Sequence, residues 1–471
     1  NQIDNLLDRY QDREFVYLRR HLPPAEATRI ESLGIAGVSS LREYGRYYPA
    51  GPITSHVLGF TDVDDRGQEG IERAFDNHLA GIEGRKRVLR DRKGRVVEDI
   101  ESIHPVYHGR DLQLSLDLRI QVSAQRHLAQ ATHEHHAAGA SAVMLDVQTG
   151  EVLAMANQPA YNPNDRSRLN VASLRNRAII DQFEPGSTMK PLTVMAAMET
   201  GRYHPRTLID TSPGHIRVGQ KTLLDPVNYG LIDLTKVITK SSQVGVTKIA
   251  LDMQPNQVRD MYERVGLGQG TGIGFPGESV GLLPNKARWT DIERANFAFG
   301  HGLSTTALQL AQAYSVIANY GEKRDVSLLY RDSIPPAERV IDRRIAKQMV
   351  AMLETVAGPQ GTAKRAQITA YPVAGKTGTT HKVGREGYVA DRYQAIFAGL
   401  APADDPRVVS VIVVDEPSSG AYFGGLVAAP IFASVAEAAL RLMHVPPREL
   451  PQQAASNKVT RLAAEKRGPL S

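Results

Sequence analysis

A serine and a lysine three residues apart, Ser187 and Lys190, are the first candidates for chemistry in this sequence. Proline is tolerated in the first turn of a helix but disrupts its interior, so Pro191 predicts a helix that begins close to Ser187. At helical spacing the two side chains lie on one face, one turn apart. A serine becomes a good nucleophile when a base removes its proton, and a lysine can be that base only when burial or a nearby positive charge keeps it neutral. The pair predicts nucleophilic catalysis, although alone it fits a solvated helix start equally well.

Two later segments strengthen this interpretation. The first contains Ser241-Ser242-Gln243, and the second contains Lys376-Thr377-Gly378-Thr379. In this order, the three segments match the Ser-x-x-Lys, Ser-x-Asn and Lys-Thr-Gly signature of penicillin-binding proteins and β-lactamases. The chemistry requires these residue types: Ser187 attacks a carbonyl and Lys190 accepts its proton. Ser241 can relay a proton, and Lys376 disfavours a charge on Lys190 and can bind a substrate carboxylate.

The Lys376 segment also predicts how a substrate is held. Thr377 and Thr379 offer hydroxyl groups to a carboxylate, and Gly378 keeps the strand surface clear so that a peptide can lie against it as an added strand. We expect the backbone amides of Ser187 and Thr379 to form an oxyanion hole.

Composition sets the limits of this prediction. The chain has 471 residues, is 42% hydrophobic and 23% charged, and carries a formal net charge of +5, which indicates a globular protein of two or three domains. The basic excess is mild and has no long basic run, so nucleic-acid binding is not implied. The absence of cysteine excludes disulfides, thiol catalysis and cysteine-based metal sites. No run of 18 or more apolar residues and no signal peptide is visible.

A metal site is the weaker interpretation of one histidine-rich segment, His133-Glu134-His135-His136. Its spacing is not the His-Glu-x-x-His of helical zinc sites, so a solvated helix end is favoured. We therefore expect no metal and no cofactor.

The pattern along the chain predicts three parts. Residues 1–110 predict an irregular, β-rich, non-catalytic module with a strand pair around a turn at Lys93-Gly94. Residues 111–445 predict an α/β domain whose sheet collects strands from both ends of the segment, with helices between them. Residues 446–471 predict a flexible tail. The strands and helices expected in the second part are strands at 112–116, 141–156 (a hairpin), 394–399 and 407–414, and helices at 120–131, 234–251, 255–265, 306–319, 343–356 and 429–443.

Over nearly its whole length the sequence resembles the class B penicillin-binding proteins, most closely those of the septal (cell-division) type. The resemblance rests on the Ser187 segment 183–191, on segments of the first region (46–49, 70–72, 91–94), and on the segments 265–268, 274–278 and 415–425. It implies a transpeptidase domain of the penicillin-binding and serine β-lactamase fold, an antiparallel sheet with helices, behind an N-terminal pedestal. In the family the last of these segments places aromatic side chains beside the acyl-enzyme, which implicates Tyr422 and Phe423.

The resemblance also implies a function. Ser187 would attack a peptidoglycan stem peptide ending in D-Ala-D-Ala, release the last D-Ala, and pass the acyl group to an amine of a neighbouring stem. β-Lactams would acylate the same serine. The family acts at the periplasmic face of the inner membrane, is anchored there by one N-terminal helix that these residues do not include, and works with a lipid-linked glycan polymerase and other division proteins.

Two residues depart from the family pattern. Gln243 stands where the family has asparagine, so the amide that binds the substrate or β-lactam is displaced by one methylene. His301 stands where division relatives carry a tyrosine, and a cleft position there would alter β-lactam fit and pH response. The two departures suggest a divergent second copy of the division enzyme.

Four alternatives remain open at this stage. A serine β-lactamase needs a group that activates a deacylating water, and no glutamate beside the Ser241 segment suggests one. A β-lactam sensor would not need the first region. A vestigial scaffold is suggested by Gln243, and an elongation-type transpeptidase is the alternative within the family.

Overall fold

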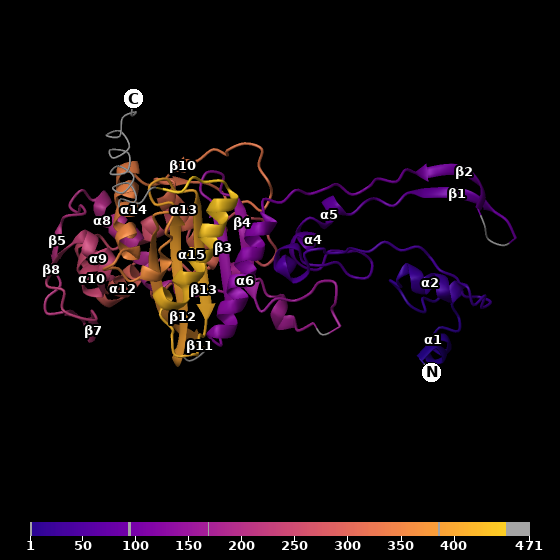
Figure 1. The fold of residues 1–471 in the computed structure, drawn as a ribbon, viewed down its shortest axis with the longest axis horizontal. Helices are drawn as coiled ribbons and strands as arrows, with labels where there is room; N and C mark the ends of the chain where they lie inside the picture. Colours follow the sequence, from indigo (N-terminus) through magenta and orange to yellow (C-terminus); the bar gives the residue numbers. More distant parts are fainter. Residues whose placement is uncertain (1, 93–95, 168, 385–386, 449–471) are drawn as a thin grey trace, which may run out of the picture. The chain divides into compact units, whose positions relative to one another are not determined.

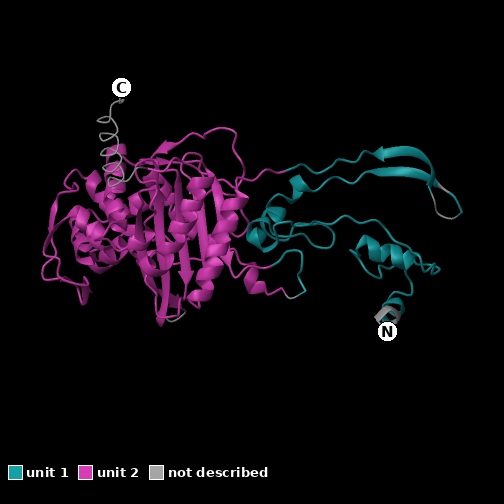
Figure 2. Cartoon of the chain, viewed as in Figure 1, with its two compact units in different colours: residues 1–111, 162–168 teal, residues 112–161, 169–471 magenta. Residues whose placement is uncertain are grey.

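The computed structural model describes residues 2–92, 96–167, 169–384 and 387–448 (Figure 1). The chain forms two compact units (Figure 2). The first comprises residues 1–111 and 162–168, and the second comprises residues 112–161 and 169–471. The predicted flexible tail falls mainly on residues 449–471, which lie outside the described residues.

Short helices and one strand pair make up the first unit. The predicted strand pair is confirmed as β1 and β2, while the turn expected at Lys93-Gly94 lies outside the described residues. The other named elements are short helices, so the described part of this unit has less strand than the β-rich region that we expect from the sequence. Two glycines let the backbone segments of this unit pack closely: a Cβ on Gly59 would lie 1.8 Å from the Glu69 carbonyl oxygen, next to Gly70. The elements are α1 (Gln2–Arg9), α2 (Pro24–Glu31), η1 (Gly51–Ile53), α3 (Ser55–Leu58), α4 (Gly70–Ala74), α5 (Asp76–Leu79), β1 (Arg85–Arg90) and β2 (Val96–His104).

An excursion from the middle of the chain completes the small core of this unit. Arg166 stacks its guanidinium 4.7 Å from the centre of the Phe60 ring and donates a hydrogen bond to the Thr61 carbonyl. Asn164 donates to the carbonyl of Tyr48, whose hydroxyl in turn accepts from the Thr61 amide. These contacts explain why residues 162–168 belong with the first unit.

A five-stranded antiparallel sheet forms the centre of the second unit, in the order β11-β12-β13-β3-β4. Its strands come from both ends of the segment, as the sequence predicts. They are β3 (Gly139–Asp146), β4 (Val152–Gln158), β11 (Ala374–Gly384), β12 (Gly387–Ala401) and β13 (Val408–Asp415). Every residue of β3 and β13 is buried, because helices cover both faces of the sheet.

Helices α6 (Leu118–Glu134) and α15 (Gly424–Leu442) pack against each other on one face, and α13 (Ala307–Ala318) packs on the other (Figure 1). Helices α8 to α12 gather on the side of β11. The remaining elements are η2 (Val171–Leu174), α7 (Arg177–Ile180), η3 (Gly186–Met189), α8 (Lys190–Glu199), β5 (Leu208–Asp210), β6 (His215–Val218), β7 (Lys221–Leu224), β8 (Leu231–Asp233), α9 (Leu234–Lys240), α10 (Gln243–Asp252), α11 (Gln257–Arg264), α12 (Asp291–Ala298), β9 (Glu322–Lys323), β10 (Glu338–Arg339), α14 (Arg343–Ala357) and η4 (Lys364–Ala366).

Side chains of α6 cover the outer edge of β4. Gln121 both donates to the Met155 carbonyl (2.9 Å) and accepts from the Met155 amide (2.8 Å), and Gln125 donates to the Asn157 carbonyl (3.1 Å). Three backbone groups that an edge strand would leave unpaired are thereby bonded within the domain. The other edge of the sheet is β11.

Three expected elements differ from those observed. Residues 112–116 make only an isolated bridge, between Leu114 and Leu329. The helix expected over 234–251 is two helices, α9 and α10, because Ser241 adopts a left-handed conformation between them. Helix α15 begins at Gly424 rather than 429 and contains Pro430, which cannot donate to the Leu426 carbonyl; Arg365 reaches that carbonyl at 3.5 Å.

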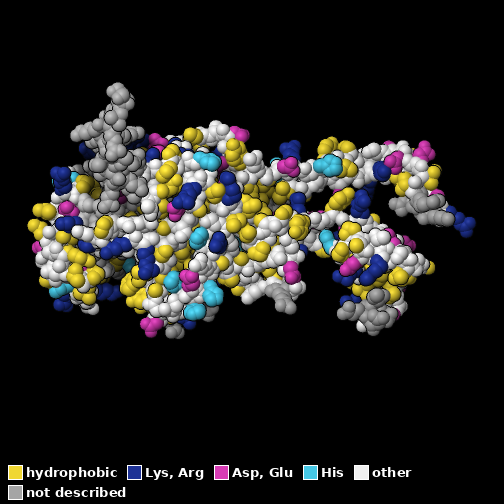
Figure 3. Space-filling model, in the orientation of Figure 1, with side chains coloured by type: hydrophobic (Ala, Val, Ile, Leu, Met, Phe, Trp, Pro, Cys, Tyr) yellow, Lys and Arg dark blue, Asp and Glu magenta, His cyan; other side chains and the backbone are white. Residues whose placement is uncertain are grey.

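Among the described helices, α15 is long and apolar enough to cross a membrane, and 56% of its apolar window is buried inside the domain. Its contacts with β12, β13 and α6 make it a core helix of this unit. On the face shown in Figure 3, basic and acidic side chains are interspersed over the second unit.

Candidate active site

Ser187 lies in the one-turn helix η3, directly before α8. Gly186 turns the chain into η3 with a φ of +55°, and its amide donates to the Gly300 carbonyl at 3.1 Å. The two glycines touch backbone to backbone, since a Cβ on Gly300 would lie 2.2 Å from the Gly186 carbonyl oxygen. Tyr314 also donates from its buried hydroxyl to the Thr188 carbonyl at 2.7 Å. The turn that carries the serine is therefore held from two sides.

Lys190 follows one turn later, as its spacing predicts, and its backbone amide donates to the Ser187 carbonyl. The structure brings Lys190 together with Ser241 and Lys376. The Lys190 Nζ donates to the Ser241 carbonyl at 2.5 Å and to its hydroxyl at 3.2 Å. The Lys376 Nζ, from β11, donates to the same hydroxyl at 2.9 Å.

Both ammonium groups are buried, and this sets their protonation. Burial lowers the pKa of Lys190 to about 7, against an opposing rise from the charge of Asp225. Burial, together with the charge of Lys190, lowers the pKa of Lys376 well below its ordinary value. Two buried amines beside one hydroxyl disfavour a charge on both at once. A neutral lysine can then accept a proton near neutral pH.

The left-handed backbone of Ser241, with a φ of +58°, gives this hydroxyl its position between two helices. Ser242 then caps α10 by accepting from the Gly245 amide at 2.9 Å. Gln243 begins α10 with its side chain half-buried. The short polar segment 241–243 thus interrupts the helix, and this places the Ser241 hydroxyl within hydrogen-bond distance of two lysines.

Sequence reasoning missed Asp225, which is 8% exposed and follows the short strand β7. Its carboxylate accepts from the Ser242 hydroxyl (2.6 Å), the Gln243 amide (2.6 Å) and the Val244 amide (3.2 Å). The contact joins residues 17 to 19 positions apart through a small hairpin, and no local pattern signals it.

Strand β11 presents the Lys376 segment along the edge of the sheet. Thr377 bonds the Thr362 hydroxyl at 2.9 Å, and the Thr379 hydroxyl accepts from the Gly424 amide at 3.0 Å, the first residue of α15. Gly378 faces the serine turn: a Cβ there would lie 3.0 Å from the Pro185 carbonyl oxygen. Its missing side chain therefore makes room for the segment that carries Ser187, in addition to the role expected from the sequence.

His301 lies at the centre of a cluster that joins three segments. The carboxylate of Glu184 accepts from the Gly302 amide (2.8 Å) and the Tyr388 hydroxyl (2.9 Å), and it pairs with the His301 Nδ1 at 2.8 Å. Burial alone would raise the pKa of Glu184, but the hydrogen bonds from His301, Gly302 and Tyr388 outweigh it and lower the pKa. Burial and the hydrogen bond to Glu184 raise the pKa of Tyr388. The cluster ties the serine segment to the loop at 300–302 and to β12.

Tyr422 and Phe423 belong to a row of aromatic rings. Tyr422 stacks on Tyr393 with ring centres 4.1 Å apart, and Phe423 packs against Tyr422 at 4.5 Å. Tyr393 in turn contacts His381 at 4.6 Å. Phe423 is 53% exposed, so its ring is open to a ligand.

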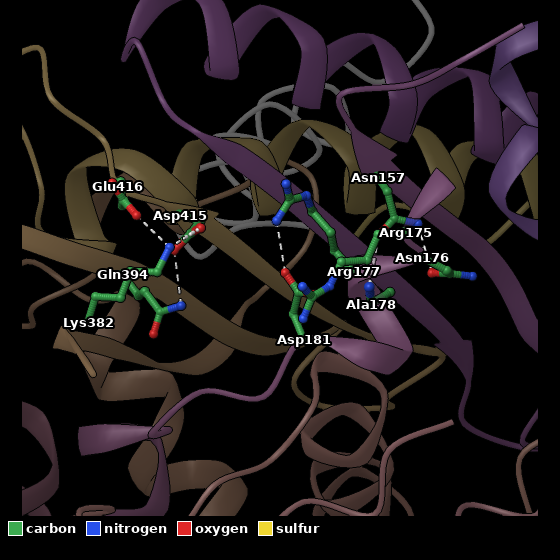
Figure 4. Close-up of polar contacts among 10 residues, drawn as sticks. All are labelled: Asn157, Arg175, Asn176, Arg177, Ala178, Asp181, Lys382, Gln394, Asp415 and Glu416. Atoms are coloured by element: carbon green, nitrogen blue, oxygen red, sulfur yellow. Dashed lines mark hydrogen bonds and ion pairs between the residues drawn. The ribbon is translucent and has the colours of Figure 1, made fainter. Parts of the chain in front are cut away.

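The loop that carries Tyr422 and Phe423 is fixed near its start, where it leaves β13. Lys382 pairs with Asp415 at 2.8 Å and with Glu416 at 2.5 Å (Figure 4). Two residues after Glu416, the Ser418 amide donates to the His135 carbonyl at 2.8 Å. The histidine-rich segment weighed as a metal site thus anchors this loop. Within the described residues, no group of three or more metal-binding side chains occurs.

Comparison with known proteins gives a consistent picture. Residues 140–437 match the family described as the penicillin binding protein transpeptidase domain, and residues 1–114 match the penicillin-binding protein dimerisation domain. The chain is 44% identical over 436 residues to the peptidoglycan D,D-transpeptidase FtsI of Escherichia coli, covering 93% of this chain and 74% of that protein. It is 38% identical to the probable peptidoglycan D,D-transpeptidase PbpC of Pseudomonas aeruginosa, covering 93% of this chain and 78% of that protein.

Solved structures agree. The apo transpeptidase domain of Burkholderia pseudomallei penicillin-binding protein 3 is 39% identical and superposes with a TM-score of 0.66, covering 72% of this chain and 98% of that one. The apo penicillin-binding protein 3 from Mycobacterium tuberculosis is 34% identical with a TM-score of 0.76, covering 86% of this chain and 92% of that one.

Proposed function

This chain belongs to the class B penicillin-binding proteins and is a peptidoglycan D,D-transpeptidase of the septal type, and we propose that Ser187 is its nucleophile. The observation that carries this assignment is that two buried lysines, Lys190 and Lys376, both donate to the Ser241 hydroxyl. Lys190 follows Ser187 by one turn.

In the acylation step, the Ser187 Oγ attacks the carbonyl of the penultimate D-Ala while its proton passes to neutral Lys190. An ester bond forms, the peptide bond to the last D-Ala breaks, and the leaving amine receives the proton through Ser241. We expect the amides of Ser187 and Thr379 to stabilise the oxyanion. In the second step an amine of a neighbouring stem attacks the ester carbon and gives its proton to Lys190. An amide bond forms, the ester bond to Ser187 breaks, and Lys190 returns the proton to the Ser187 Oγ.

Substrate binding follows the open edge of the sheet. We propose that the stem peptide lies along β11, with its carboxylate bound by Thr377, Thr379 and Lys376 and its amide by Gln243. Tyr422, Phe423 and His301 line the same cleft, and a β-lactam occupies the donor site and acylates Ser187.

The cellular setting is also part of the proposal. Membership of the family supports action at the periplasmic face of the inner membrane, with a single N-terminal membrane anchor. It also supports cooperation of the first unit with a lipid-linked glycan polymerase and with division proteins.

A β-lactamase is the competing function for this site. It requires a free carboxylate to activate a deacylating water, and the buried carboxylate near Lys190 is that of Asp225. Both of its oxygens already accept hydrogen bonds from the Ser242 hydroxyl and from two backbone amides. This favours an acyl-enzyme that awaits an amine over one that is rapidly hydrolysed.

Intact-protein mass spectrometry after incubation with a penicillin tests the assignment. We expect an adduct that persists for hours, maps to Ser187 and is lost in Ser187→Ala while the variant stays folded. Labelling that survives in Ser187→Ala would refute the nucleophile. Rapid turnover without a lasting adduct would indicate a β-lactamase, and no reaction with wild type would indicate a vestigial scaffold.

A further inference from the structure

Asp225 is a buried carboxylate at the active site whose role the steps above leave unassigned. It accepts three hydrogen bonds, all from Ser242, Gln243 and Val244, the residues that follow Ser241 directly. Both carboxylate oxygens are used, one by the Ser242 hydroxyl and the other by the two backbone amides. A charged acceptor on backbone N–H groups makes stronger hydrogen bonds than a neutral one, especially where water is excluded.

These bonds act on the break between α9 and α10. Ser241 is held in a left-handed conformation that an L-residue adopts only under constraint from its surroundings. The residues on its C-terminal side form the first turn of α10, whose free N–H groups need acceptors. Asp225 supplies those acceptors from a separate part of the chain, so it fixes the point at which the Ser241 backbone reverses.

The small hairpin β6–β7 fixes Asp225 in turn. Leu224 pairs with His215 at the end of the hairpin, and the Asp225 amide donates to the Gly214 carbonyl at 2.9 Å. The segment between α8 and α9, which contains this hairpin, therefore positions the Asp225 carboxylate beside the Ser241 segment.

The second effect of Asp225 is electrostatic. Its negative charge raises the pKa of Lys190, in opposition to burial. The other titratable groups with a charge effect here are Lys376, which repels Lys190, and Tyr229, whose pKa is raised by burial and by Asp225. One anion beside two buried amines favours one retained proton between them.

We propose that Asp225 is the positioning residue of this transpeptidase site: it holds Ser241 between the two lysines and supplies the negative charge that balances the lysine pair. This inference rests on the proposed roles of Ser187, Lys190 and Ser241.

The test measures the second-order rate of acylation by a fluorescent penicillin as a function of pH in wild type, Asp225→Asn and Asp225→Ala. Asparagine keeps the shape and one acceptor but removes the charge. We expect its acid limb to move to lower pH by about half a unit or more, because Lys190 loses a stabilising anion. Alanine removes all three hydrogen bonds, and we expect a fall in rate of about 10²-fold.

Asp146→Asn is the matched control. Asp146 is also 8% exposed and also accepts from two backbone amides and a hydroxyl, at the end of β3, three strands away from β11. We expect it to lower the melting temperature to a similar extent and to leave the pH profile of acylation unchanged.

The outcomes separate the inference from the function on which it rests. If Asp225→Asn gives the same pH profile as Asp146→Asn while wild type labels at Ser187, the positioning role is overturned and the nucleophile stands. If Asp225→Ala fails to fold, the Asn profile still decides. Labelling of Ser187→Ala would overturn the underlying assignment regardless of Asp225.

Discussion

Lys190 on α8 and Lys376 on β11 donate to one and the same atom, the hydroxyl oxygen of Ser241, at 3.2 Å and 2.9 Å. Three parts of the chain that are far apart in sequence thus meet at one hydroxyl, and both lysine side chains are buried there. Because neither amine has a carboxylate as a direct hydrogen-bond partner, the protonation of the pair is set by burial and by the surrounding charges.

The rate of acylation should increase with pH, because the base that accepts the serine proton must be neutral. As pH rises through the pKa of Lys190, which burial lowers to about 7, the rate of β-lactam acylation should rise and then level off. Stopped-flow labelling between pH 5 and pH 9 measures this. In Lys190→Ala the rate should fall by about 10²- to 10⁴-fold and lose this limb; a limb that persists would assign it to another group.

The effects of the Ser241 hydroxyl and of the Ser241 backbone conformation should be measurable separately. Ser241→Ala and Ser241→Gly both remove the hydroxyl, so both should slow acylation by about 10²-fold. Glycine tolerates a φ of +58°, so Ser241→Gly should unfold with a free energy about 1 kcal/mol larger than Ser241→Ala. Kinetics and chemical denaturation on both variants test this, and equal stability would argue against strain at Ser241.

Gln243→Asn should move the side-chain amide by one methylene. Because the side chain is half-buried and its backbone amide bonds Asp225 in either variant, the melting temperature should change by less than about 2 °C. The acylation rate should change several-fold. A large change in melting temperature with an unchanged acylation rate would contradict the proposed contact of the Gln243 side chain with the substrate.

Gly300→Ala should displace the nucleophile. Its Cβ would overlap the Gly186 backbone at 2.2 Å, so we expect a loss of about 3 kcal/mol of stability and strongly reduced acylation. Gly302→Ala is the control two residues away. It has a φ of +76° and no atom within 4 Å of its Cβ, so only the backbone cost of about 1 kcal/mol applies. Equal effects in the two variants would exclude the backbone contact as the cause.

Glu184 should contribute stability that depends on pH. Its pKa is lowered in the folded state, so its contribution is present above the ordinary value of 4.5 and is lost as pH falls through the lower folded value. Glu184→Gln should cost about 1–3 kcal/mol at pH 7, because the amide cannot replace both acceptor oxygens. Thermal unfolding between pH 3 and pH 7 measures both effects.

The control for Glu184 is Glu437→Gln on the exposed face of α15, where the ion pair with Arg441 faces solvent. We expect a change within about 0.5 kcal/mol for this variant. A Glu184 variant that behaves in the same way would show that the cluster with His301 and Tyr388 is not structural.

The sequence was most informative where residue type and spacing alone carry the chemistry. Pro191 placed the helix start beside Ser187, and the order of the three short segments indicated Ser241 and Lys376 before any contact was known. The alternating apolar residues of 141–156 predicted the hairpin β3–β4 for the same reason, since a local pattern determines a local structure.

What the sequence did not reveal depends on tertiary contacts. Asp225 reaches its partners through a hairpin whose strands are only four residues long, too short for a periodic signal. Tyr388 meets Glu184 from 204 positions away, and His135 anchors a loop 284 positions later. The left-handed conformation of Ser241 was not predicted, because its flanks favour helix and only the fold imposes this turn. The roles of the site residues stay predictions until they are tested.

The side chains of Gln121 and Gln125 along β4 affect where an extended peptide can add to the sheet as a further strand. An extended peptide that adds itself to a sheet needs a strand with unbonded amides and carbonyls. At β4, α6 already bonds the Met155 amide and carbonyl and the Asn157 carbonyl. An unfolded polypeptide, or another copy of this protein, therefore pairs poorly with the edge of β4. The other edge of the sheet is β11, the strand that carries Lys376. The contacts of α6 with β4 therefore favour β11 as the edge at which the proposed stem peptide adds as a strand.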